Sequence, residues 1–398
     1  MAHRYSRRHI LTVAAALMAT TVAPGVALAR PDAPVTITLP APTGPNPVGV
    51  TQVHLTDTSR IDPWDPARQR ELIVQIWYPA DAADTSPLAA WPTPGGLEEL
   101  RYSLLQSGVA PDLWTLAPGH SRTDARAATG RYPLLLNSPG LGDTTGLNTA
   151  QAEDLASHGY IVAAINHTHE AFAVRFPDGR TERGVVPLNS SLDVLSNQLI
   201  PIRVADTSFV LDQLTDAATD PAAARPGLPE HLAEALDPAK VAMFGHSLGG
   251  STAAQAMHDD RRIAAGVNLD GPMLGSVASN GLDKPLLLLA ADTSPWFTAP
   301  GWEPYWANNT GLKLPLRIAG TRHMSLTDGQ IIVTALADAG LFPSDMKDIA
   351  VGPIDPNRSV GLQRSYLLTY FDAVFGRSTG NPIEIIGRLA QPEMLPHH

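Results

Sequence analysis

One serine of the chain lies in a setting that activates serine for attack on an ester. Residues 245–249 read Gly-His-Ser-Leu-Gly, a G-x-S-x-G motif, with an apolar run at 240–244 before it and a helical pattern at 248–258 after it. A strand–turn–helix of this kind holds its serine on a strained turn, and the glycines let neighbouring backbone approach closely. The pattern predicts Ser247 as a nucleophile for acyl transfer and the backbone N–H of Leu248 as a donor to the oxyanion.

A serine nucleophile needs a histidine base, and in this setting the acid and the histidine follow the serine along the chain. The histidines downstream of the serine are His258, His323, His397 and His398. His258 lies three turns along the helix that the serine begins, and the last two end the chain. His323 closely follows an apolar strand pattern at 314–319, where a loop can direct it toward the serine. We therefore predict that His323 is the base.

Two acidic residues are candidates for the third member of the triad. Asp270 follows an apolar strand pattern at 263–269, and Asp292 comes just after the next one, at 285–290. Catalytic groups gather at the carboxyl ends of strands in open α/β sheets, and both positions qualify. Aspartate is also a common turn former and helix cap. Spacing along the sequence leaves both residues open.

The elements that must position these residues alternate between strand and helix. Strand patterns occur at 48–55, 72–78, 132–137 and 160–165, besides those at 240–244, 263–269, 285–290 and 314–319. Helical patterns occur at 145–158, 192–214, 248–258, 325–339 and 361–375. Such alternation predicts a mostly parallel, doubly wound α/β sheet with helices on both faces. Two stretches, near 80–130 and 168–200, read as lid-like insertions into this single domain of residues 30–398.

The composition excludes several classes of protein. The chain has 398 residues, of which 44% are hydrophobic and 17% charged, so it can bury a sizeable core. Its formal net charge of −11 argues against nucleic acid as a partner. The absence of cysteine excludes disulfides, thiol catalysis and zinc–thiolate sites. We expect a monomer that needs no cofactor.

The N-terminal residues 1–29 have the pattern of an export signal. Arg4, Arg7 and Arg8 precede an apolar run from Ile10 to Val22, and Ala-Leu-Ala at 27–29 is typical of a cleavage site. The adjacent arginines favour the twin-arginine type over an ordinary secretory signal. No later apolar stretch reaches the length of a membrane span. The sequence thus predicts a secreted protein that begins near Arg30.

Motifs along most of the chain resemble the secreted platelet-activating-factor acetylhydrolases and their bacterial relatives. The likeness rests on the segments 42–49, 76–79, 132–142, 154–164, 245–250, 269–270 and 320–323. It implies an α/β-hydrolase fold, with Asp270 as the triad acid and the N–H groups of Leu141 and Leu248 as oxyanion donors. The family usually has a His-Gly pair in the loop before Leu141, whereas Pro139 precedes Gly140 here.

Other features bear on the substrate. Five aromatic residues crowd the stretch 296–306, and we expect Trp296, Phe297, Trp302 and Trp306, together with His246 beside the nucleophile, to contact substrate. The same rings can equally pin a long loop to the core. The run His-Thr-His-Glu at 167–170 favours a polar rim of the site over a metal site, since no other ligand spacing supports coordination.

The predicted activity is therefore hydrolysis of a small-molecule or lipid ester through a Ser-His-Asp triad. The candidate substrates are short-acyl phospholipids, triglycerides, aryl esters such as hydroxycinnamates, and polyesters. An inactive binding protein that retains the fold, and an amide hydrolase, are the alternatives of other classes.

Overall fold

The computed structural model describes residues 33–220, 227–294, 301–389 and 391–396. The signal-like segment 1–29 therefore lies outside the described residues, as do Trp296 and Phe297. Within the described residues, no helix has both the length and the apolar character needed to cross a bilayer.

A ten-stranded sheet, in the order β14-β13-β12-β11-β10-β6-β7-β3-β2-β5, forms the centre of the molecule. Its six inner strands run parallel: β6 (Tyr132–Ser138), β7 (Ile161–Asn166), β10 (Leu236–His246), β11 (Ile263–Leu269), β12 (Leu286–Ala291) and β13 (Lys313–Ile318). At one edge β3 (Gln69–Pro79) runs antiparallel to both β7 and β2 (Val48–Ile61), and β5 (Arg122–Thr123) pairs with β2. At the other edge β14 (Met394–Pro396) runs antiparallel to β13.

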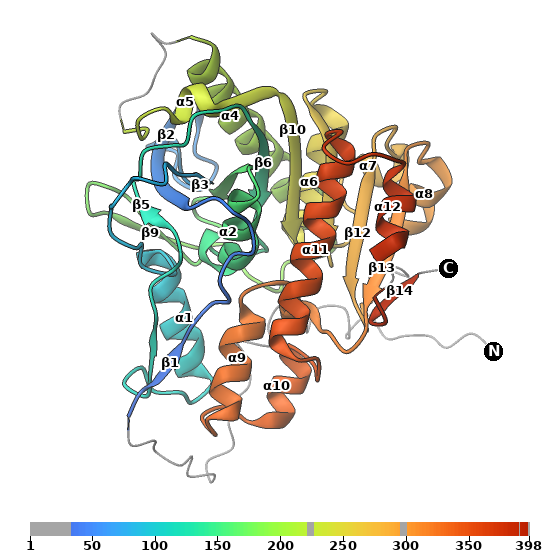
Figure 1. Ribbon diagram of the computed structural model, residues 1–398. Coiled ribbons are helices and arrows are strands. Elements are labelled where there is room, and N and C mark those ends of the chain that lie inside the picture. The colour runs from blue at the N-terminus through green and yellow to red at the C-terminus, as the bar shows by residue number, and fades with distance from the viewer. Residues whose placement is uncertain (1–32, 221–226, 295–300, 390, 397–398) are drawn as a thin grey trace, which may run out of the picture.

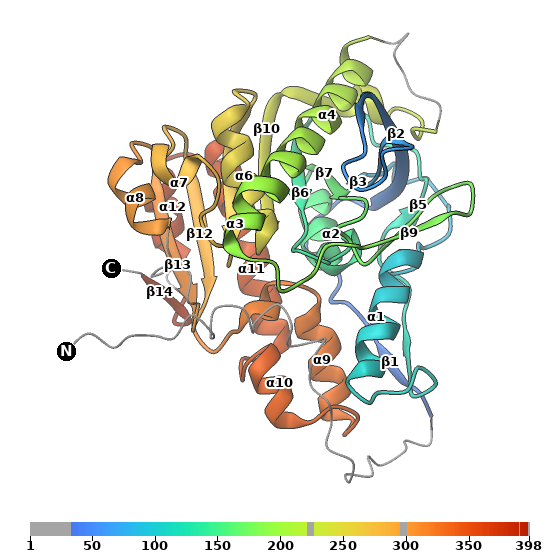
Figure 2. The ribbon, with the colours of Figure 1, turned by 180° about the vertical axis from the view of Figure 1, so that it is seen from behind.

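Helices cover both faces of this sheet. One face carries α4 (Ile200–Thr219), α5 (Leu232–Ala235), α6 (Leu248–Asp259), α7 (Val277–Asn280) and α8 (Trp302–Asn308). The other carries α2 (Thr149–Ser157), α11 (Pro356–Val374) and α12 (Pro382–Leu389). Figure 1 shows α11 and α12 in front of the sheet, and Figure 2 shows α4 and α6 on the opposite side. The predicted doubly wound α/β fold is confirmed, since every strand pattern read from the sequence matches a strand of this sheet and none extends more than one residue beyond it.

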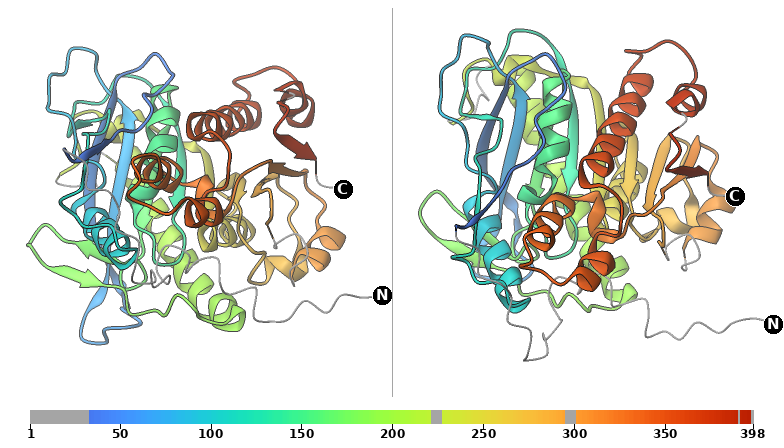
Figure 3. Two further views of the ribbon diagram at one scale, coloured as in Figure 1. Left: turned by 90° about the horizontal axis from the view of Figure 1, so that it is seen from below. Right: turned by 60° about the horizontal axis from the view of Figure 1, so that its bottom comes forward.

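A third, smaller core lies beyond one end of the sheet. It joins α1 (Pro94–Gln106) to α9 (Gly329–Asp338) and α10 (Ser344–Ala350), next to a two-stranded pair of β1 (Val35–Ile37) and β4 (Trp114–Leu116). Figure 1 shows these elements grouped below the sheet, and Figure 3 shows them from below. Trp91 and Trp114 are buried there and anchor the stretch 80–130 to the body of the protein.

The second insertion begins with a short hairpin of β8 (Ala173–Arg175) and β9 (Thr181–Arg183). It packs on α1, where Gly95 approaches so closely that a Cβ would lie 2.3 Å from the carbonyl oxygen of Ala173. A short helix, α3 (Leu192–Val194), and a π-turn (Leu195–Leu199) then lead into α4. The two stretches that the sequence marks as insertions are thus joined to one another.

Candidate active site

The turn between β10 and α6 holds Ser247 in a strained conformation. Its φ of 55° and ψ of −122° are rare for a residue with a side chain. The positions of the two flanking glycines have no room for a side chain. A Cβ at Gly249 would lie 1.8 Å from the carbonyl oxygen of Ser138, and a Cβ at Gly245 would lie 2.3 Å from the carbonyl oxygen of Gly249. The turn that carries Ser247 therefore packs directly against the end of β6 and the loop that follows it. Ser247 is half-buried, whereas the residues on both sides of it are buried.

His323 and Asp270 meet at the carboxyl ends of β11 and β13. His323 opens a 3-10 turn (His323–Leu326), and its Nδ1 lies 2.6 Å from Oδ2 of Asp270. Both side chains are buried. Asp270 itself has a positive φ of 52°, and its other oxygen accepts a hydrogen bond of 3.0 Å from the N–H of Ala291. The carboxylate is therefore fixed by two partners, one of which is the histidine ring.

Asp292 has a different set of contacts. Its Oδ2 accepts from the N–H of Gly320 at 3.0 Å, and its own N–H donates to Oγ1 of Thr321 at 3.2 Å. These bonds brace the turn that leads from β13 to His323. Of the two acids that sequence spacing left open, the structure brings only Asp270 into contact with the histidine.

His246 packs directly on His323. Their ring centroids are 4.4 Å apart, and His246 is only 1% exposed. Its Nε2 donates to the carbonyl oxygen of His323 at 3.0 Å, and its Nδ1 lies 3.5 Å from Oδ2 of Asp143. This burial gives His246 a supporting position beneath the histidine, whereas the sequence predicted contact with substrate.

The loop after β6 carries the predicted oxyanion donor Leu141. This residue is half-buried, and a Cβ at neighbouring Gly140 would lie 3.3 Å from Nδ1 of His246, so the loop borders the turn that carries Ser247. The second predicted donor, Leu248, is the first residue of α6, and the N–H groups of a helix's first turn have no acceptor within the helix. The N-terminal end of α6 also carries the positive end of the helix dipole.

The aromatic stretch before β13 divides between core and surface. Trp302 and Tyr305 have no exposed surface and pack in the main core with their rings 5.6 Å apart. Trp306 is half-buried against them, and Lys313 donates to its carbonyl oxygen. Trp302 therefore pins this segment to the core in the structure rather than lining a site, because a side chain without exposed surface offers nothing to a substrate.

The run His-Thr-His-Glu at 167–170 does not form an exposed rim. Its four residues are between 1% and 7% exposed, so that interpretation is wrong. Within the described residues, no group of three His, Asp or Glu side chains is arranged to hold a metal ion. The run instead belongs to a buried polar network with Arg70 on β3 and with Arg203 and Asp206 on α4. Sequence analysis missed these three residues, although for Arg203 and Asp206 a charged residue on the apolar side of a helical pattern was a signal.

Comparison with known proteins assigns the chain to a family. The family model for platelet-activating factor acetylhydrolase, isoform II, matches residues 34–183 and 226–353. The chain belongs to this family. The match includes the turn that carries Ser247, both candidate acids and His323, and it leaves out residues 184–225, which contain the whole of α4.

Two relatives match nearly the whole chain. A protein of Arthroderma benhamiae, described as a probable 1-alkyl-2-acetylglycerophosphocholine esterase, is 28% identical over 396 residues, which cover 93% of this chain and 95% of its own. The solved structure of a ferulic acid esterase from Streptomyces cinnamoneus has a TM-score of 0.73 and 32% identity, and covers 91% of this chain and 99% of its own. The platelet-activating factor acetylhydrolase of Cavia porcellus is 27% identical over 64% of this chain and 61% of its own. Family membership and these relatives make the chain a carboxylic-ester hydrolase.

Proposed function

We propose that the chain is an exported serine esterase that hydrolyses lipid or aryl esters through an acyl-enzyme. In this proposal Ser247 attacks the ester carbonyl, His323 takes the proton of the serine and returns it to the leaving alcohol, and Asp270 holds the imidazole. The N–H groups of Leu141 and Leu248 stabilise the oxyanion, each contributing on the order of 3 kcal/mol. Water then attacks the acyl group with His323 again as the base, which releases the acid and restores the serine.

The observation that carries the proposal is the hydrogen bond of 2.6 Å between His323 and Asp270. The serine in the strained turn lies beside this pair, because its N–H donates at 2.9 Å to the carbonyl oxygen of Leu269, the residue before Asp270. Because the carboxylate of Asp270 accepts a hydrogen bond from Nδ1 of His323, Nδ1 carries the proton. Nε2 is then left with the lone pair that a base needs. The same carboxylate stabilises the imidazolium that forms when the serine loses its proton. The strained turn presents the serine at the start of α6.

Two substrate classes have support from the comparisons. The Arthroderma benhamiae relative favours a phospholipid with a short acyl chain, and the Streptomyces cinnamoneus structure favours an ester of a hydroxycinnamic acid. Both substrate classes are esters of an alcohol. They differ in the size of the acyl group, which is small in the phospholipid and large in the hydroxycinnamate. The proposal therefore commits to the reaction and to these two classes of ester.

Export is the second part of the proposal, and it rests on the pattern of residues 1–29. Arg7 and Arg8, the apolar run and the small residues at 27–29 form the signal. The N-terminal sequence of protein recovered from the culture medium tests this part, and we expect it to begin near Arg30. Protein that stays inside the cells with its first residues intact would overturn it.

The activity is tested with p-nitrophenyl esters from acetate to palmitate, with a 2-acetyl ether phospholipid and with methyl ferulate, on the protein without residues 1–29 and on its Ser247→Ala variant. We expect turnover that the variant loses by a factor on the order of 10⁴ or more. Acetyl esters turned over faster than long-chain esters would favour the phospholipid, and methyl ferulate as the best substrate would favour the ester of a hydroxycinnamic acid. No turnover of any ester would indicate a binding protein, and turnover of the matching anilide at a similar rate would indicate an amide hydrolase.

A further inference from the structure

A second Ser-His-Asp constellation lies behind the predicted oxyanion loop. Oγ of Ser138, at the end of β6, is 2.9 Å from Nε2 of His167, and Nδ1 of His167 is 2.9 Å from Oδ2 of Asp206. These are the connections of a catalytic triad, yet Ser138 and Asp206 have no exposed surface and His167 is 2% exposed. No substrate reaches a serine in such a place, so the constellation has another task.

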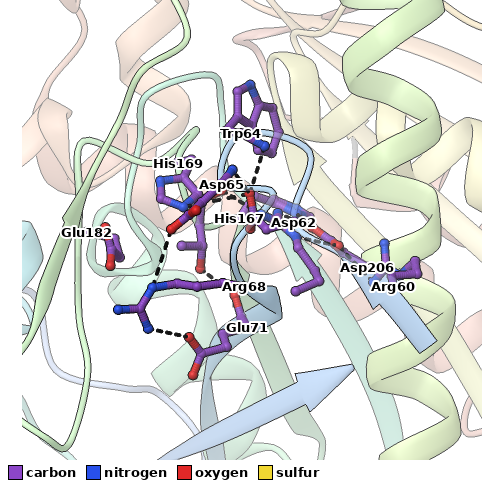
Figure 4. Close-up of polar contacts among 12 residues, drawn as sticks. Arg60, Asp62, Trp64, Asp65, Arg68, Glu71, His167, His169, Glu182 and Asp206 are labelled. Atoms are coloured by element: carbon purple, nitrogen blue, oxygen red, sulfur yellow. Dashed lines mark hydrogen bonds and ion pairs between the residues drawn. The ribbon is translucent and has the colours of Figure 1, made fainter. Parts of the chain in front are cut away.

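The direction of its hydrogen bonds follows from the charge on Asp206. Burial raises the pKa of this carboxyl, but the Arg70 charge and the hydrogen bonds from His167 and Arg70 outweigh burial and hold the pKa well below its ordinary value. An ionised carboxylate only accepts, so Nδ1 of His167 carries the proton and Nε2 accepts from the hydroxyl of Ser138. Figure 4 shows His167 and Asp206 together with Asp62, which forms an ion pair with Arg70 at 2.9 Å.

Arg203 on α4 joins this constellation to the oxyanion loop. Its Nη1 donates to Oγ of Ser138 at 3.2 Å and to the carbonyl oxygen of Pro139 at 2.7 Å, and its Nη2 donates to that of Gly140 at 3.2 Å. Glu170 holds the guanidinium from its other side, with Oε2 2.7 Å from Nε. Arg203 is 1% exposed, and a planar guanidinium with this many fixed partners has a single orientation.

The consequence for catalysis comes from the geometry of one peptide unit. The carbonyl of Gly140 and the N–H of Leu141 belong to the same planar trans peptide, so they point in opposite directions. When Arg203 binds the carbonyl oxygen of Gly140, the N–H of Leu141 must point away from Arg203. Ser138, Pro139 and Gly140 are thereby fixed against rotation before any substrate arrives, which is the condition for an effective oxyanion hole.

We infer that Arg203, held by Glu170 and by the buried Ser138–His167–Asp206 constellation, is a positioning residue that aims the N–H of Leu141 at the oxyanion. This inference rests on the proposed function, since it needs the acyl-transfer mechanism and Leu141 as a donor. Arg203 touches neither substrate nor nucleophile and acts only through the loop.

The test uses Arg203→Lys, which keeps the positive charge and loses the planar set of guanidinium N–H donors. We expect kcat on p-nitrophenyl acetate to fall about 10- to 100-fold with KM changed less than threefold, because the oxyanion forms only in the transition state. A trifluoromethyl ketone, whose adduct with the serine carries an oxyanion, should lose affinity by the same factor as kcat/KM. The plain methyl ketone should bind as before.

Arg364 provides a matched control. It lies on α11, is 5% exposed, and also donates to three backbone carbonyls, those of Pro40, Ala41 and Ala150. None of these carbonyls belongs to the oxyanion loop. Arg364→Lys should therefore lower the melting temperature and leave kcat within about twofold.

Three results would overturn the inference. They are a folded Arg203→Lys variant with unchanged kcat, a loss that lies in KM alone, and an equal loss of kcat in Arg364→Lys. If Arg203→Lys does not fold, Ser138→Ala decides: it removes one link of the constellation, and the inference requires a lower kcat at unchanged KM. Activity that survives Ser247→Ala would contradict the proposed function itself, whereas activity lost there and unchanged in the Arg203 and Ser138 variants would contradict only this inference.

Discussion

Two Ser-His-Asp sets lie side by side in this molecule, and they differ in the backbone and exposure of the serine. Ser247 is half-buried in a strained turn at the start of a helix, while Ser138 is fully buried at the end of a strand. The acids differ as well, because Asp206 is also paired with Arg70 and Asp270 is not. In the proposed mechanism only the set with Ser247 is catalytic, so the comparison indicates that hydrogen-bond connectivity alone does not make a catalytic triad. The serine must also be accessible and adjacent to oxyanion donors.

Labelling of the serines separates the two sets most strongly. We expect a fluorophosphonate to react with Ser247 and not with Ser138, because only the first is accessible and has a base whose Nε2 is not already engaged by a buried hydroxyl. Ser247→Ala should abolish labelling, and Ser138→Ala should retain it. Peptide mapping by mass spectrometry measures this, and a modified peptide containing Ser138 would contradict the distinction.

Replacing Asp270 should affect catalysis, whereas replacing Asp206 should affect stability. We expect Asp270→Asn to lower kcat on the order of 10⁴-fold, because the histidine loses the group that fixes its tautomer. Asp206→Asn should lower the free energy of unfolding by about 3–5 kcal/mol, because Arg70 would be left as an incompletely paired buried charge. Steady-state kinetics and urea unfolding on both variants measure the two effects. A folded Asp206→Asn variant that has normal stability and loses activity as Asp270→Asn does would reverse the roles.

Asp292 sharpens the comparison within the site. Its carboxylate braces the turn before His323 and does not contact the ring, so we expect Asp292→Asn to lower kcat by no more than about tenfold. The amide oxygen of asparagine can still accept from the N–H of Gly320, which keeps the turn in place. A loss as large as that of Asp270→Asn would make Asp292 the acid.

The smallest expected effect is a dependence of stability on pH. Burial lowers the pKa of His167, and the Arg203 charge lowers it further. A histidine whose pKa is lower in the folded state contributes stability above its unfolded pKa of about 6.5, and this contribution is lost as the pH falls toward the folded value. Asp206, whose folded pKa is also lowered, loses its contribution only below about pH 4.

Burial raises the pKa of Asp328 to about 7 and also raises that of Glu99 and Glu153, and these carboxyls gain stability as the pH falls. We therefore expect the effect of His167 in the difference between two proteins: lowering the pH from 7.5 to 5.0 should be less favourable to the melting temperature of the natural chain than to that of His167→Gln, by a few degrees. Differential scanning calorimetry at the two pH values measures the difference. The same change in both proteins would show that His167 does not titrate in the folded state as its surroundings require.

The parts of the site that lie within one local pattern could be predicted from the sequence. The G-x-S-x-G turn specifies its own geometry, since Gly245 and Gly249 remove the side chains that would clash with the oxyanion loop. The strands and main helices followed from the periodicity of their apolar residues. Helix α1 did not, because Gly95 and Gly96 in its first turn disfavour a helix. These glycines serve close packing instead, Gly95 on the carbonyl oxygen of Ala173 in β8 and Gly96 on Thr144 and Pro92.

What only the tertiary structure decided is which polar residues meet across large separations in the chain. Asp270 and Asp292 have the same local signature, and the difference lies in which one His323 reaches from the end of β13. Likewise, the sequence predicted His167 as part of a site rim and Arg203 only as part of a helix. In the fold both side chains are buried and contact the hydroxyl of Ser138. Local propensity and periodicity are encoded in neighbouring residues. The partner of a buried charge is instead fixed by how distant elements pack, because burying a charge without a partner costs too much free energy.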